Sequence, residues 1–245
     1  MSALKSLIPD WRAPATVHAL STTRCGGVSL GAYRSLNLAT HVGDNPHHVA
    51  ANRTRLATAY QLPAAPYWLE QVHSTRVVEA SPQHRGAAAD ASFSRQRQQV
   101  CAVLTADCVP ILLCSTQGTV VAAAHAGWRG LAGGIIDNTV HALGCPPSEL
   151  LAWIGPAIGA AAFEVGAEVK AEFCMSDPTA DAWFAPTVAG RWRADLIGLA
   201  RHRLQGLGVG AISGGEWCTY QNADQFFSYR RDGISGRMAT LIWID

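Results

Sequence analysis

The sequence predicts an α+β protein, built as a sandwich of sheets and helices rather than as a Rossmann fold. Two observations favour this class. Apolar runs typical of strands outnumber the long amphipathic segments typical of helices, and several of the strand pairs look antiparallel. The 245 residues contain no Gly/Ser/Pro-rich linker and no block of like charge that would divide them. We therefore expect a single domain over residues 1–245.

Strand patterns recur along the chain as short apolar runs bounded by turn residues. The predicted strands are 15–23, two short strands within 67–80 around the tripeptide "HST", 100–105, 109–114 and 119–126. Near the C-terminus, "QFFSYRRDGISGRMATLIWI" contains Asp-Gly, a dipeptide that favours a tight turn between strands. We expect this last segment to form a hairpin.

Three segments have the spacing of apolar residues that is typical of amphipathic helices. The first covers 47–62 and stops before Pro63. The second covers 130–144, where Gly144 is a suitable helix stop, and the third covers 193–208 and also ends in glycine.

The bulk composition describes an ordinary globular protein, with 49% hydrophobic residues, 15% charged residues and a formal net charge of +1. This balance gives no electrostatic reason to expect a nucleic acid or an anionic membrane as partner. The seven cysteines are scattered and form no C-x-x-C pair, and the N-terminus lacks the apolar core of a signal peptide. We therefore expect reduced thiols and a cytoplasmic protein.

Three potential metal ligands each follow or end an apolar strand pattern: His73 in "EQVHS", Cys108 in "TADCVP" and His125 in "AAAHAGWRG". Imidazole and thiolate are the ligands that Zn²⁺ prefers, and three protein ligands leave one tetrahedral position open. Taken singly, a histidine at a strand end is more often a satisfied polar residue, and a cysteine in an apolar run is more often inert. Their combination predicts a zinc site that the fold would have to assemble.

Neighbouring residues add to this hypothesis. Alternation along "WLEQVHS" puts Gln71 on the same face as His73, so that Gln71 can share the site. After His125, "AGWRG" turns into a helix and places Arg129 at its N-terminus, where backbone N–H groups and a guanidinium favour an anion.

Two alternatives use the same residues without a metal. Cys108 can act as a nucleophile with His125 as its base, oriented by Asp107 or His73. A module that binds a small ligand without converting it is the other alternative. Zinc is favoured because two histidines converge with one cysteine, one histidine more than a dyad requires.

The sequence resembles the YfiH family, also called the laccase-domain or peptidoglycan-editing-factor family. The resemblance covers nearly the whole chain, through "STTRCGGVSLGAYRSLNLATHVGD", "WLEQVHS", "VLTADCVPILL", "VVAAAHAGWRGL", "AWIGPAIG" and "FFSYRRDGISGRMATLIW". The metal-site motifs of the family are matched at His73, Cys108 and His125.

This resemblance implies an α/β/β/α-type sandwich with one zinc ion. It further implies phosphorolysis of adenosine, inosine and methylthioadenosine to the base and a pentose 1-phosphate, and deamination of adenosine to inosine. Small molecules are then the expected partners, in a monomer or a weak homo-oligomer. Arg129, Arg24 and Arg230 are the candidates for the phosphate seat, with Gln71 as a further substrate contact.

Other activities are linked to the family. One is copper-dependent polyphenol oxidation; the sequence lacks the H-x-H pairs that build multicopper sites, although a single copper can replace zinc. Another is hydrolytic editing of peptidoglycan precursors. For deamination, a carboxylate that is not a metal ligand is expected to carry the proton. Asp107 is our first candidate, before Glu164 and Glu70.

Overall fold

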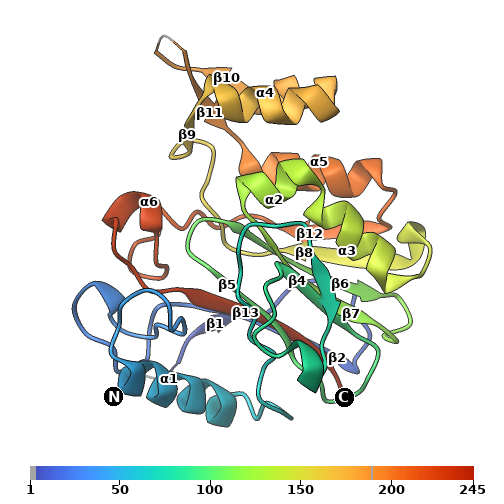
Figure 1. Ribbon diagram of the computed structural model, residues 1–245. Helices are drawn as coiled ribbons and strands as arrows, with labels where there is room; N and C mark the ends of the chain where they lie inside the picture. The colour runs from blue at the N-terminus through green and yellow to red at the C-terminus, as the bar shows by residue number, and fades with distance from the viewer. Residues whose placement is uncertain (1–3, 189) are drawn as a thin grey trace.

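The structure is a computed structural model and describes residues 4–188 and 190–245. Two β-sheets pack face to face, and helices cover the outer face of each sheet (Figure 1). The predicted α+β sandwich is therefore confirmed, including the α/β/β/α order that the family resemblance implied.

The first sheet has four antiparallel strands and includes the first and the last strand of the described residues. Its order is β1 (Ser6–Leu7), β2 (Val17–Thr22), β13 (Met238–Ile244) and β5 (Cys101–Thr105). The C-terminal strand β13 thus lies in the middle of the sheet, hydrogen-bonded on both sides.

The second sheet has six strands and is mixed. Its order is β12 (Ala211–Gly214), β8 (Leu150–Ile154), β6 (Val109–Ser115), β7 (Val121–Ala126), β4 (Ala91–Ser94) and β3 (Val77–Glu79). The outermost pair at each edge is parallel and the inner pairs are antiparallel.

Both faces of β6 are buried, which explains why its sequence is apolar throughout. Ile111 and Leu113 face the helices, whereas Leu112 and Cys114 face the four-stranded sheet. The helices on the first side are α2 (Trp128–Gly133), α3 (Ile135–Leu143) and α5 (Leu196–Gly206). On the opposite side of the sandwich, α1 (Pro46–Ala59) packs against the four-stranded sheet through Leu56.

A smaller unit projects from the side of the sandwich that α2, α3 and α5 cover (Figure 1). It consists of α4 (Ala167–Ser176) and an antiparallel sheet of β10 (Phe184–Pro186), β11 (Arg191–Ala194) and β9 (Glu164–Gly166). The remaining short elements are α6 (Tyr229–Asp232) and 3₁₀ helices at Gly31–Tyr33, Pro82–His84, Pro147–Glu149 and Pro178–Trp183. Every helix within the described residues is too short or too polar to cross a bilayer.

The predicted C-terminal hairpin is wrong. Of the segment 225–244, only β13 is a strand, because both of its edges are already paired with β2 and β5. The residues before it form the single turn of α6, where the Ser228 side chain accepts a hydrogen bond from the backbone of Arg231.

Two other predictions need correction. The segment before His73 makes only isolated bridges, at Tyr67 and Glu70, so that His73 lies in a loop rather than at a strand end. The helix predicted over 130–144 is divided at Gly134, whose φ of 98° is left-handed and therefore incompatible with a continuous helix.

One buried amide holds the long loop between β2 and α1. Asn52, fully buried on α1, accepts a hydrogen bond from the Val28 backbone and donates to the Ser29 hydroxyl and the Asn37 carbonyl, at 2.8, 2.9 and 2.9 Å. Removing this side chain leaves several buried polar groups without a partner.

We expect Asn52→Ala to lower the free energy of unfolding by about 3 kcal/mol, since each orphaned group costs roughly 1–3 kcal/mol. Urea denaturation measures this change. Asn138→Ala is the matched control, because its exposed amide makes one hydrogen bond, to Thr75. Equal losses in the two variants would contradict the role given to Asn52.

Candidate metal centre

Three donor side chains meet where the two sheets adjoin. Cys108 directly precedes β6, and His125 lies on the neighbouring strand β7, paired with Pro110. The loop before β3 adds His73. The ligand atoms of the three residues all lie within 4.8 Å of one another, and Sγ of Cys108 is 3.8 Å from Nε2 of His73. The fold therefore assembles the three ligands predicted from the sequence into a group that could bind a metal ion.

The link between β5 and β6 explains the break in the apolar sequence at "TADC". β5 belongs to the four-stranded sheet and β6 to the six-stranded sheet, so residues 106–108 carry the chain from one sheet to the other. Asp107 has a φ of 92° at this change of direction, and His73 has a φ of 60°. A left-handed backbone at a residue other than glycine costs about 1–3 kcal/mol and is frequent at functional sites.

A buried carboxylate, Asp90, supports the loop that carries His73. It accepts hydrogen bonds from the backbone of His73 at 3.0 Å and from the backbone and hydroxyl of Ser74 at 2.6 and 2.7 Å. These bonds offset the strain at His73. Burial alone would raise the pKa of Asp90, but hydrogen bonds from His125 and Ser74 outweigh it and lower this pKa to about 2.

The same carboxylate orients His125. Oδ1 of Asp90 lies 2.8 Å from Nδ1 of this buried histidine, which leaves Nε2 as the nitrogen available to a metal ion. Sequence reasoning missed Asp90. The available signal was an isolated acid in the alanine-rich stretch "AAADASF", immediately before a buried strand.

Glycine is required beside the three donors. A Cβ atom at Gly127 would lie 2.6 Å from Cδ2 of His73 and 3.0 Å from Sγ of Cys108. Only a residue without a side chain therefore allows the backbone to pass this close to the ligands.

The charges at the site suit a metal ion. Burial would raise the pKa of the Cys108 thiol, but His125 and His73 outweigh this effect and lower it. The Cys108 thiolate and the Asp90 carboxylate in turn raise the pKa of His125 against the effect of its burial. A thiolate and two imidazoles fit a tetrahedral Zn²⁺ with one free position. The same thiolate–imidazolium pair also suits a nucleophilic cysteine.

A cavity of about 380 Å³ opens beside the donors. Its polar lining residues are His41, Gln71, His73, Thr105, Cys108, His125, Tyr229 and Arg237. Gln71 thus lies at the site, where its amide also bridges both backbone groups of Leu104, at 2.7 and 2.8 Å. His41, Tyr229 and Arg237 were not identified from the sequence, because no metal-type or catalytic pattern surrounds them.

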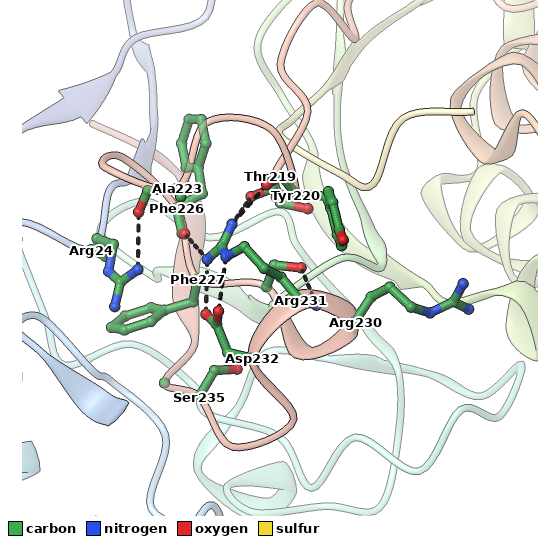
Figure 2. A network of polar contacts seen from close by, with 12 residues as sticks. Arg24, Thr219, Tyr220, Ala223, Phe226, Phe227, Arg230, Arg231, Asp232 and Ser235 are labelled. Carbon is green, nitrogen blue, oxygen red and sulfur yellow. Dashed lines mark hydrogen bonds and ion pairs between the residues drawn. The ribbon is translucent and has the colours of Figure 1, made fainter. Parts of the chain in front are cut away.

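The three arginines proposed from the sequence lie outside the lining of this cavity. The exposed Arg129 guanidinium lies over the Trp128 ring, 4.3 Å from its centroid. Arg24 donates to the Ala223 carbonyl and lines a separate surface groove (Figure 2). The Arg230 side chain points away from the network in Figure 2 and donates to the Glu164 carbonyl at 2.8 Å.

Asp107 faces the segment that carries Tyr229. Its two carboxylate oxygens accept hydrogen bonds from the Thr219 hydroxyl at 2.6 Å and from the Arg230 backbone at 2.7 Å. Within the segment, Arg231 donates to the carbonyls of Thr219, Tyr220 and Phe226 and pairs with Asp232 (Figure 2). These contacts favour a positioning role for Asp107 over the proton transfer suggested by the sequence.

We expect Asp90→Asn to weaken metal binding about 10- to 100-fold, because removal of the carboxylate beside a ligating histidine has that effect. Competition with a chromophoric chelator measures the metal affinity. Asp137→Asn is the control. It breaks the ion pair between Asp137 of α3 and Arg203 of α5, and neither residue lines the cavity. Unchanged affinity in Asp90→Asn would show that Asp90 does not orient a metal ligand.

The sequence and the fold have close counterparts among known proteins. Residues 18–245 match the family model described as multi-copper polyphenol oxidoreductase laccase. The "Purine nucleoside phosphorylase YfiH" of Escherichia coli (strain K12) is 51% identical over 241 residues, which cover 98% of this chain and 99% of that protein.

Two solved structures agree with the fold. A Neisseria meningitidis protein is 53% identical, with a TM-score of 0.95 over 98% of this chain and 99% of the other. YlmD from Geobacillus stearothermophilus is 33% identical, with a TM-score of 0.88 over 94% and 92% of the two chains. From the family match and these identities, the chain belongs to the laccase-like YfiH family that its motifs resemble.

Proposed function

We propose that this protein is a zinc-dependent purine nucleoside phosphorylase that acts on adenosine, inosine and methylthioadenosine. The observation that carries the proposal is that His73, Cys108 and His125 lie together in the lining of a cavity of about 380 Å³. This volume lies within the roughly 300–1,000 Å³ typical of small-molecule sites. The name of the Escherichia coli relative supports the choice of substrate.

In this reaction an oxygen of phosphate forms a bond to C1′ of the pentose as the bond from C1′ to the purine nitrogen breaks. The purine leaves with the electron pair and takes up a proton. When bound, the metal supplies Lewis acidity beside the nucleoside. The protein contributes Gln71 and the ring of Tyr229 to the lining of the cavity. Tyr229 is 59% exposed; the Arg237 guanidinium lies over its ring, 5.7 Å from the centroid, and the opposite face of the ring is the one proposed to stack on a purine.

A single metal ion accounts for the donor groups better than a multicopper centre. Within the described residues, His73, Cys108 and His125 are the one group of three or more suitable side chains. Multicopper oxidation needs several copper sites, so the family description does not carry over as chemistry. Copper in place of zinc is compatible with one thiolate and two imidazoles.

Deamination of adenosine is a second reaction that we assign to the same cavity. It needs a group that transfers protons near C6 of the purine, usually a carboxylate. Glu70 and Glu164 are exposed on the surface, and Asp107 is engaged by Thr219 and Arg230. His41 and Tyr229 line the cavity and therefore become the residues to test for this role.

A metal-free Cys108–His125 hydrolase, acting on a peptidoglycan precursor, is the alternative that the opposite pKa shifts of these two residues favour. We place the protein in the cytoplasm, because all seven cysteines are unpaired. We also propose that residues 1–245 form one domain, because the two main sheets share a buried core.

Incubation of the purified protein with adenosine, inosine or methylthioadenosine should release the free base only when phosphate is present. Chromatography of the base and the pentose 1-phosphate measures the reaction. Base release that is independent of phosphate would indicate hydrolysis, and no release from any nucleoside would refute the proposed function.

Replacing Cys108 by Ala should remove most of the zinc and lower phosphorolysis about 100-fold or more, since the remaining two histidines hold the ion weakly. Elemental analysis and the rate of base release measure the two effects. Cys145→Ala is the control, because Cys145 is half-buried and does not line the cavity. Full activity in wild-type protein freed of metal would instead support the cysteine nucleophile.

A further inference from the structure

We propose that Arg237 and His41 form the phosphate-binding subsite of the cavity that the metal-ligand group also lines. The proposal rests on the proposed function and deepens it, because it names the residues that hold the second substrate. It replaces Arg129, Arg24 and Arg230, whose side chains are engaged outside the cavity.

Arg237 is a half-buried guanidinium with unused donors. It directly precedes β13 and lines the cavity. Its hydrogen bonds, to the carbonyls of Ser235 and Gly236 and to the Ser235 hydroxyl, all leave from Nη1, at 2.8, 3.0 and 3.2 Å. Across residues 4–188 and 190–245, Nε and Nη2 meet no acceptor, and no carboxylate forms an ion pair with this side chain. A cation withdrawn from water needs a compensating anion.

The positive charge of Arg237 acts on its neighbour in the cavity lining, His41. Burial lowers the pKa of Arg237, although Cys108 and Asp107 act in the opposite direction. The pKa of His41 is lowered by burial and by the nearby Arg237 and Arg53. Mutual repulsion of this kind is relieved when an anion binds between the groups.

The two residues are held in place by one buried amide. Oδ1 of Asn37 accepts hydrogen bonds from the backbone of Arg237 and of Ala39, both at 3.0 Å, and Nδ2 donates to Asp44 at 2.9 Å. The loop that carries His41 is thereby fixed to the start of β13. Gly236 permits this approach, since a Cβ there would lie 2.9 Å from Cβ of Asn37.

This geometry matches the needs of the reaction. Nε and Nη2 of an arginine present two parallel donors, which bind two oxygens of a tetrahedral phosphate. A phosphate held in this way keeps a third oxygen free to attack C1′ of a nucleoside bound in the same cavity. The arginine positions the nucleophile and limits its motion before the bond forms.

The test is titration of inorganic phosphate into zinc-loaded protein by calorimetry, together with KM for phosphate at saturating adenosine. Arg237→Gln should raise Kd and KM for phosphate roughly 10- to 100-fold, the loss expected for charge-assisted hydrogen bonds. Arg237→Lys and His41→Gln should cause smaller increases. KM for the nucleoside should change about threefold or less. Arg193→Gln is the matched control, because Arg193 is an exposed arginine of β11 and does not line the cavity.

Unchanged phosphate affinity in Arg237→Gln, or a larger loss in Arg129→Gln, would overturn the subsite. Thermal unfolding checks that each variant folds; if Arg237→Gln does not, then Arg237→Lys and His41→Gln decide. Phosphate binding that depends on Arg237 without base release would refute the proposed function and leave the subsite standing. Base release with an unchanged KM for phosphate in Arg237→Gln would overturn the subsite and leave the proposed function standing.

Discussion

The candidate metal centre depends on one buried carboxylate. Asp90 accepts hydrogen bonds from the loop that holds His73 and from the ring of His125, and thereby fixes two of the three metal donors with a single side chain. Its position before β4 is set by the pairing of β4 with β7. Because an ionised carboxylate in the interior needs all its acceptor sites filled, the loop and the imidazole stabilise Asp90 as much as Asp90 stabilises them.

Much of the fold was accessible from the sequence because both faces of the central strands are buried. β6 and β7 show as continuous apolar runs, and α1 and α5 were located to within a few residues by their spacing. The hairpin was mispredicted because Asp232-Gly233 has the composition of a tight turn, whereas pairing of β13 with β2 and β5 is a long-range property. Local patterns carry no information on which strand occupies the middle of a sheet.

The candidate site could be predicted only in part, because local patterns do not show which distant residues the fold brings together. His73, Cys108 and His125 have side chains whose chemistry is distinctive, and the quoted motifs mark them. Asp90, His41 and Arg237 are ordinary polar residues whose importance comes from what the fold places beside them. Arg129 shows the opposite error: a helix N-terminus favours anions in general, yet its side chain lies over Trp128 and outside the cavity.

The central position of β13 has a consequence for synthesis on the ribosome. β2 and β5 are made before β13, which joins them and follows every other strand among the described residues, and Arg237 immediately precedes it. The nascent chain therefore holds two strand edges open until β13 is made, and open edges favour pairing with other chains. Loss of β13 would leave the sheet divided, so a product truncated before this strand should be an aggregation-prone polypeptide rather than a weakened enzyme.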